Sequence, residues 1–294
     1  FAKNLADLDV KERRKPQKGA FTIRQNNQTT EWQLQTAGST AGEKVKIRRL
    51  RKNEMTTLDQ LNLNSSQLEQ FKSLTEKKQG IFIVSGPPKS GATTTFYALL
   101  RNHDAFLNSI NTLEKEPQGQ LRNIQQETFT LTDTGTTSYG KKLQGIVRMG
   151  PDIVGVADCE EQETAQVICS SAKEGILMYV ELQANSAAQA LARWIKLVSD
   201  KSKALNQLLG VSNQRLMRRL CEECKEGYEP NRELLRKFNL PAEKAKVLYR
   251  AGKIQYTKRG KEQTCEHCMG TGYYGRIGVF ETVMMADELK KAIK

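Results

Sequence analysis

Two hydrophobic patterns alternate along most of the chain. Short continuous apolar runs are typical of strands that are buried on both faces, and they occupy residues 80–85, 109–113, 153–157 and 176–182. Helical spacing of apolar residues separates these runs, at residues 93–101, 139–148, 161–173 and 186–198. Buried strands that alternate with helices predict an α/β core with a parallel sheet.

The start of the chain follows other patterns. Residues 1–20 are strongly charged and predict a helix that ends near Pro16. Three short alternating runs, separated by Asn, Gly and Ser, predict strands joined by turns at residues 20–24, 31–35 and 45–50. Residues 58–78 have helical spacing, with Ser65 or Ser66 as a cap within the segment.

The composition fits a folded protein of about two domains with a small third module. The 294 residues are 38% hydrophobic and 27% charged, which excludes a disordered or collagen-like chain. No apolar run approaches the roughly 18 residues that a membrane span needs. Two histidines exclude a site built from several imidazoles. The chain begins at Phe1, so we expect a piece of a longer protein.

The net charge of +13 is concentrated at the two ends of the chain. The balance is +6 over residues 1–60, −2 over residues 61–200 and +9 over residues 201–294. Basic ends raise the local concentration of anionic partners, which include nucleic acid, an anionic membrane surface and an acidic protein. Simple solvation of the surface by Lys and Arg is the alternative interpretation.

A glycine-rich loop follows the first buried run. It reads GPPKSGATTT from residue 86, close to the phosphate-binding template G-x-x-x-x-G-K-[ST] between a strand and a helix. The glycines let backbone N–H groups surround phosphate oxygens in front of a helix N-terminus, and Thr93 offers a hydroxyl to Mg²⁺. The predicted nucleotide-binding residues of this loop are Gly86, Pro87, Lys89, Ser90, Gly91, Ala92, Thr93 and Thr94.

Ala92 occupies the lysine position of this template. The missing cation would neutralise charge on the β- and γ-phosphates, and its loss costs on the order of 3 kcal/mol in the transition state. Lys89 lies in the same loop and is the candidate replacement. The alternative is a loop that keeps its fold but not its ligand.

An ordered set of motifs extends over nearly the whole chain. The segments are residues 8–19, 39–45, 80–97, 111–117, 147–156, 175–187, 214–221 and 272–281. Together they resemble the type II secretion and type IV pilus assembly ATPases, the general secretory pathway E and PilB family. The resemblance implies a RecA-like P-loop core with a parallel-type sheet, preceded by a small α/β domain and followed by a four-cysteine zinc module. The implied domains are the α/β domain (residues 1–60), the RecA-like domain (61–218) and the zinc module (219–275). Residues 276–294 are the implied start of a C-terminal helical region.

The resemblance also implies roles for single residues. Glu114 matches the acidic-box glutamate that orients the attacking water, and Arg148 matches a basic position ahead of the second nucleotide strand. Asp158 is either an acid that contacts Mg²⁺ through water or a solvated loop residue. ATP and Mg²⁺ are the implied ligands. The implied assembly is a hexameric ring, peripheral at the cytoplasmic face of the inner membrane, that docks on a membrane platform protein.

Several positions depart from the family pattern. Besides Ala92, they are Lys89 for a glycine, Lys115 inserted between Glu114 and Glu116, Gln144 for an arginine, Ala157-Asp158 for Gly-Glu, and Gln183 for the histidine of the histidine box. Together they predict weak nucleotide binding and no turnover, and they favour natural decay over one laboratory substitution. Three functions therefore compete: an assembly motor, a structural or regulatory pseudo-ATPase, and a nucleic-acid-binding protein. The third lacks a basic groove interleaved with aromatic residues.

Four cysteines form two C-x-x-C pairs separated by 40 residues, namely Cys221, Cys224, Cys265 and Cys268. Four thiolates predict a closed tetrahedral Zn²⁺ site with a structural role. Free thiols or a disulfide are the alternatives, and His267 is a competing ligand. Cys159 and Cys169 lie in apolar runs and are predicted to be small buried hydrophobes.

Overall fold

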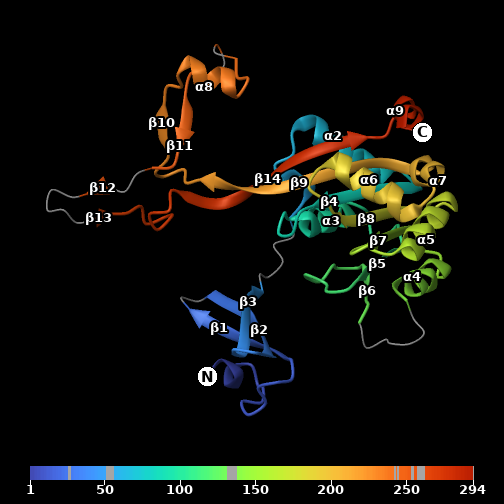
Figure 1. Ribbon diagram of the computed structural model, residues 1–294, viewed down its shortest axis with the longest axis horizontal. Coiled ribbons are helices and arrows are strands. Elements are labelled where there is room, and N and C mark those ends of the chain that lie inside the picture. Colours follow the sequence, from blue (N-terminus) through green and yellow to red (C-terminus); the bar gives the residue numbers. More distant parts are fainter. Residues whose placement is uncertain are drawn as a thin grey trace. The chain divides into compact units, whose positions relative to one another are not determined.

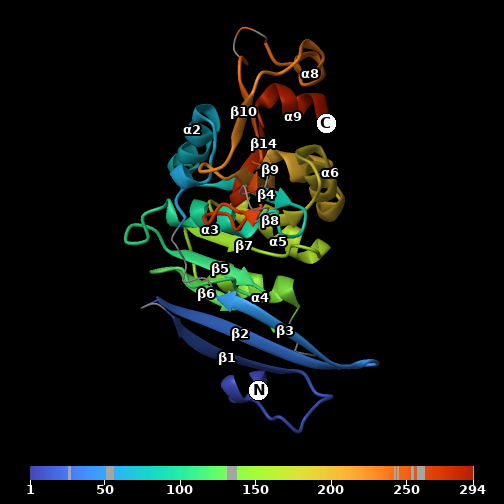
Figure 2. The ribbon, with the colours of Figure 1, turned by 90° about the vertical axis from the view of Figure 1, so that its left-hand side faces the viewer.

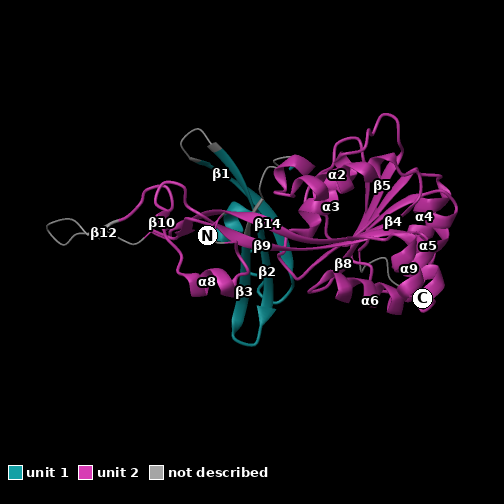
Figure 3. Ribbon diagram, turned by 90° about the horizontal axis from the view of Figure 1, so that it is seen from above, with its two compact units in different colours: residues 1–56 teal, residues 57–294 magenta. Residues whose placement is uncertain are grey.

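The computed structural model describes residues 1–25, 28–50, 56–130, 138–241, 243, 245–252, 255–256 and 262–293. The chain forms two compact units, residues 1–56 (unit 1) and residues 57–294 (unit 2), which Figure 3 shows in two colours. The finer division into four parts stays a prediction.

Unit 1 is a short helix followed by an antiparallel sheet. Its elements are α1 (Ala2–Leu5), β1 (Gln17–Gln25), β2 (Gln28–Ser39) and β3 (Gly42–Leu50). The strands pair in the order β1-β2-β3. Leu34 of β2 is fully buried, as expected where alternating side chains cover one face of a sheet. The three predicted strands are confirmed, although each is longer than its apolar run.

The helix predicted over residues 1–20 is wrong. Helix α1 ends at Leu5, and β1 already begins at Gln17. Asp7 has a left-handed φ of +52°, which ends the helical path. Further on, the Glu12 carboxylate accepts hydrogen bonds from the backbone N–H groups of Arg14 (2.7 Å) and Lys15 (3.0 Å). Such local side-chain bonds offer the backbone an alternative to helical hydrogen bonding.

Unit 2 is built on a seven-stranded sheet. In spatial order its strands are β14 (Tyr273–Met284), β9 (Leu208–Leu220), β4 (Gly80–Gly86), β8 (Leu177–Gln183), β7 (Ile153–Val156), β5 (Ile110–Glu114) and β6 (Gln125–Thr128). All neighbouring strands are parallel except β14, which pairs antiparallel with β9. The four predicted strands are all present, and the mostly parallel α/β core is confirmed.

Helices cover both faces of this sheet. Their bounds are α2 (Ser65–Ser73), α3 (Ala92–Arg101), α4 (Tyr139–Arg148), α5 (Gln162–Lys173), α6 (Ala187–Val198), α7 (Lys201–Asn206) and α9 (Asp287–Ile293). Figure 2 shows α2 and α3 on one side of the strands and α5 and α6 on the other. Within the described part of the chain, no helix is both long enough and apolar enough to cross a membrane.

The segment 58–78 is less regular than its spacing predicts. Single 3₁₀ turns, Leu58–Gln60 and Leu74–Glu76, flank helix α2. The cap is Asn64, whose side-chain oxygen accepts a hydrogen bond from the Gln67 N–H at 2.8 Å. The predicted caps Ser65 and Ser66 are instead the first two residues of α2.

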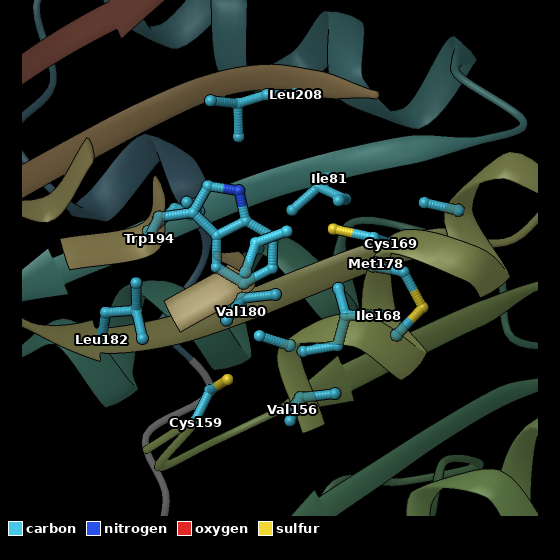
Figure 4. Close-up of a cluster of buried hydrophobic side chains, with 14 of the residues drawn as sticks. Ile81, Val156, Cys159, Ile168, Cys169, Met178, Val180, Leu182, Trp194 and Leu208 are labelled. Carbon is cyan, nitrogen blue, oxygen red and sulfur yellow. The ribbon is translucent and has the colours of Figure 1, made fainter. Parts of the chain in front are cut away.

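One hydrophobic cluster fills the space between the sheet and α4–α7 (Figure 4). Trp194 of α6 is fully buried there, and its indole N–H donates to the Ala204 carbonyl at 3.0 Å. Cys159 and Cys169 are 1% and 9% exposed within the same cluster, which confirms their prediction as small buried hydrophobes.

Gly155 of β7 allows helix α3 to approach the sheet. A Cβ at this position would lie 2.7 Å from Phe96 and 3.0 Å from Leu100. We therefore expect Gly155→Ala to destabilise unit 2 by about 2 kcal/mol through overpacking. The control is Gly145→Ala in α4, where a Cβ meets nothing within 4 Å and the helix gains up to about 1 kcal/mol. Urea unfolding of both variants measures the difference, and equal effects would contradict the packing argument.

Strands β9 and β14 continue past the core and carry a second group of elements (Figure 1). We call residues 221–272 the cysteine arm. It contains β10 (Glu226–Tyr228), α8 (Arg232–Lys237), β11 (Leu248–Arg250), β12 (Gln255–Tyr256) and β13 (Glu262–Gln263). Helix α8 lies between the two cysteine pairs.

Candidate functional site

The glycine-rich loop joins the carboxyl end of β4 to the first turn of α3, as predicted. Gly91 caps α3 with a left-handed φ of +85°, which glycine adopts without strain. A Cβ at Gly86 would overlap the Ser90 side chain and lie 2.8 Å from the Gln214 carbonyl oxygen. Gln214 of β9 also donates from its side-chain amide to the Ser90 carbonyl at 3.1 Å. The loop therefore keeps a compact backbone, held against the neighbouring strand.

Two residues of the loop differ in character from a phosphate-binding sequence. Lys89 has a φ of +67°, in the left-handed region that favours glycine, so the backbone keeps a shape that its sequence no longer matches. Its side chain is exposed and makes no hydrogen bond or ion pair with the described residues. Ala92 is buried, 7% exposed, and places a methyl group where the template has an amine. Pro87 is half-buried in the loop, and Thr94 is exposed in the first turn of α3.

The Thr93 hydroxyl is engaged by a carboxyl group that the sequence did not single out. Its Oγ1 donates to Oε1 of Glu181, on β8, at 3.0 Å. The pKa of Glu181 is raised to about 7, chiefly by burial, with smaller upward contributions from the negative charges of Asp158 and Glu114 and an opposing contribution from the Thr93 hydrogen bond. The hydroxyl predicted to meet Mg²⁺ thus faces an acid whose charge is poorly compensated.

Glu114 ends strand β5 and is almost completely buried, 2% exposed. Its Oε1 accepts hydrogen bonds from the Thr112 hydroxyl (2.9 Å) and the Gln126 amide (3.1 Å), and its Oε2 accepts one from the Tyr97 hydroxyl. Desolvation and the adjacent Glu114 raise the pKa of Tyr97 far above its usual value, so the phenol stays a donor. These three donors fix the orientation of the carboxylate at the edge where ligands of α/β sheets bind.

Asp158 follows β7 at the same edge of the sheet, with a left-handed φ of +54°. Burial raises the pKa of its carboxyl group, while the positive charge of Lys115 lowers it. Lys115 in turn pairs with Glu160 at 2.7 Å. The hydroxyl of Tyr139 contacts the carbonyl oxygens of Leu113, the residue before the end of β5, and Ala157, the residue after β7. The edge therefore places two acids, Glu114 and Asp158, on neighbouring strand ends.

The remaining candidates lie around this edge. Arg148 is exposed in the last turn of α4, and no hydrogen bond among the described residues joins it to Glu114 or to the loop. Gln183 ends β8 and is exposed, and its backbone carbonyl accepts a hydrogen bond from Arg193 at 2.8 Å. The structure thus brings Thr93, Glu114 and Asp158 to one edge of the sheet. The roles assigned to all of these residues stay predictions.

The four predicted metal ligands do come together in the cysteine arm. The sulfur atoms of Cys221, Cys224, Cys265 and Cys268 all lie within 4.8 Å of one another. Two sulfur–sulfur distances are 3.9 Å and 3.6 Å, far longer than the roughly 2.05 Å of a disulfide bond. His267 lies outside this set, is exposed, and packs against Tyr274 with the rings tilted and their centroids 4.0 Å apart.

The spacing of the thiols fits a tetrahedral zinc ion. Four ligands at Zn–S bonds of about 2.3 Å have edges of about 3.8 Å, between the two distances found here. The Gly272 N–H donates to the Cys268 sulfur at 3.2 Å, a bond that favours the thiolate form. The cluster therefore offers a closed set of four sulfur ligands that a metal such as zinc can occupy.

Comparison with known proteins places this geometry in a family. The family model described as "Type II/IV secretion system protein" matches residues 2–294. The chain belongs to this family. Type IV pilus assembly ATPase PilB of Thermus thermophilus and type II secretion system ATPase E of Vibrio cholerae are each 31% identical to it.

The two relatives match almost the whole of this chain, and solved structures share its fold. The match covers 99% of the chain but only 32% of PilB and 56% of ATPase E, so the chain spans about a third to just over half of these relatives. Among solved structures, the ATPase DotB of Legionella pneumophila superposes with a TM-score of 0.61 at 12% identity, covering 95% of this chain and 65% of DotB. The pilus retraction motor PilT with bound ADP gives 0.60 at 15%, covering 95% and 66%. These likenesses confirm the ATPase fold.

Three residues of the site were not predicted from the sequence: Tyr97, Gln126 and Glu181. Tyr97 and Gln126 bind Glu114 from elements distant in the sequence, and no local pattern indicates such contacts. Glu181 did leave a signal, because it is an ionisable residue inside an otherwise apolar run. A charged side chain within a buried strand is uncommon without a partner or a function.

Proposed function

We propose that this family member is a ring subunit of a type II secretion or type IV pilus assembly machine, and that it does not hydrolyse ATP. In this proposal it occupies a subunit position in a hexameric ring, where it makes subunit contacts and carries a zinc-stabilised arm. The ring docks on a membrane platform protein at the cytoplasmic face of the inner membrane. Its role there is structural or regulatory.

Ala92 carries the proposal. Phosphoryl transfer depends on cations that neutralise the β- and γ-phosphates, and the buried Ala92 methyl group supplies none. Lys89 is the cation that the loop does carry, but its side chain is exposed. The backbone of the loop has kept its shape, which fits a protein whose fold is still needed after its catalysis has been lost.

The alternative is an active motor that powers assembly. One observation favours it: Glu114 is buried, oriented by three hydrogen bonds and located where a water-orienting acid belongs. A fixed carboxylate of this kind can accept a proton from an attacking water. Without the lysine of the template, however, no side-chain amine neutralises the β- and γ-phosphates, so the phosphorus that the water would attack is not activated.

ATP turnover separates the two functions. We expect no Mg²⁺-dependent ATP hydrolysis by the unaltered chain and only weak binding of a fluorescent ATP analogue. Ala92→Lys restores a charge-assisted hydrogen bond, worth about 1.5–3 kcal/mol, and is expected to tighten binding about tenfold to a hundredfold. Ala286→Lys adds the same charge at an exposed position between β14 and α9 and serves as the control. Steady turnover by the unaltered chain would show that the motor is active.

A further inference from the structure

Glu181 occupies an unusual place beside the loop. It belongs to β8, which pairs in parallel with β4, and it lies opposite Val84, two residues before the loop begins at Gly86. On its other side β8 pairs with β7, which leads to Asp158. Glu181 therefore lies between the strand that carries the loop and the strand that carries Asp158.

The surroundings of Glu181 do not compensate its charge. Its described hydrogen bond is the one from the Thr93 hydroxyl, at 3.0 Å. The charged groups that act on it are Asp158 and Glu114, both negative. The phenols of Tyr97 and Tyr139, which also face it, stay neutral because burial raises their pKa values. A structural acid in a buried strand is normally paired with a cation, and none of these neighbours is one.

The carboxyl group also lies where a phosphate would approach. Thr93 is in the first turn of α3, the end at which backbone N–H groups and the helix dipole attract anions. Glu181 contacts that turn directly through Thr93. An ionised carboxylate at this point opposes the attraction of the helix N-terminus, because like charges repel strongly in a partly desolvated site.

We propose that Glu181 is a specificity-determining residue that excludes triphosphate from the loop. The proposal deepens the proposed function and rests on it, since it explains how a retained phosphate loop rejects nucleotide. Loss of the cation at Ala92 and the carboxylate of Glu181 are two separate barriers to the same ligand.

The test measures binding of inorganic tripolyphosphate in EDTA by calorimetry. Glu181→Gln keeps an oxygen that accepts the Thr93 hydrogen bond but removes the charge, and at pH 8 it is expected to bind about tenfold more tightly than the unaltered chain. Glu181→Thr removes the charge in a smaller side chain and should give the same direction of change. Glu174→Gln, an exposed acid just before β8, is the matched control and should change nothing.

A pH series adds a second readout. At pH 6 the raised pKa of Glu181, about 7, keeps most of the group neutral, so the unaltered chain and Glu181→Gln should bind equally well. The affinity ratio should then grow from about one to about ten between pH 6 and pH 8. Titration of tripolyphosphate itself cancels in this ratio.

Three results would overturn the proposal: equal affinities at pH 8, no detectable binding by either Glu181 variant, or weaker binding of Mg²⁺-ATP by Glu181→Gln. The last would mean that Glu181 helps to hold the cation. Because tripolyphosphate in EDTA reports no turnover, the result is independent of the ATPase assay. Turnover by the unaltered chain would instead contradict the proposed function.

Discussion

Replacing Cys221 by alanine is expected to release the metal and to unfold the cysteine arm. The arm contains only short elements, and its four thiols form the cluster that joins its two ends. Structural zinc binds with an apparent free energy of about 10–16 kcal/mol in small zinc-finger peptides, and that energy is also folding energy. Metal analysis of the unaltered chain should give about one zinc per chain, and the variant should give none. Limited proteolysis should then cut within residues 221–272 and leave the core of unit 2 intact.

Cys169→Ala is the matched control for this experiment. It removes a buried thiol from the hydrophobic cluster, outside the metal cluster, and is expected to keep the zinc. Its cost is about 1 kcal/mol, typical of a small core truncation. A metal-free unaltered chain, or zinc retained by Cys221→Ala, would argue against the metal site.

Replacing Glu181 by glutamine is expected to stabilise unit 2 at alkaline pH. The pKa of Glu181 is raised from 4.5 to about 7 in the folded chain, so the folded state holds its proton more tightly than the unfolded state. The contribution of this group to stability is therefore greatest at low pH and is lost as pH rises through 7. Urea unfolding should show the variant more stable by about 3 kcal/mol at pH 8 and by about 1 kcal/mol at pH 5.5.

The comparison of variant and unaltered chain isolates this one group from the other titrating residues. Glu174→Gln is exposed and should give a difference that does not vary with pH. A pH-independent difference for Glu181→Gln would mean that the folded state leaves the acidity of Glu181 near its ordinary value. The phosphate-exclusion proposal would then lose its pH-dependent readout.

Hydrophobic patterning was sufficient for the central sheet but not for its edges. The runs at β4, β5, β7 and β8 are apolar on both faces, a pattern that only buried parallel strands require. The edge strands β6 and β14, together with β9, contain many polar residues, so their sequences do not differ clearly from loops. The helix predicted over the first 20 residues was wrong for a related reason, because charged residues without hydrophobic periodicity indicate no particular element.

Spacing was sufficient for the cysteine cluster and the phosphate loop, because both are defined by short local motifs. Ala92 was visible as a missing cation in the sequence. The hydrogen bond between Thr93 and Glu181 was not, because it joins residues 88 positions apart. Only the parallel register of β8 and β4 brings that acid beside the loop. The sequence therefore indicated the missing cation, and the fold was needed to show the acid that lies beside the loop.

Strand β9 has one further consequence. Its Asn213 side chain donates to the Ser85 hydroxyl, next to the glycine-rich loop, at 2.9 Å and to the Ala184 carbonyl, just after β8, at 3.0 Å. The same strand runs without a break to Leu220, next to the metal ligand Cys221. A displacement of the metal ligand Cys221 would therefore pass along one continuous strand to the residues beside the glycine-rich loop.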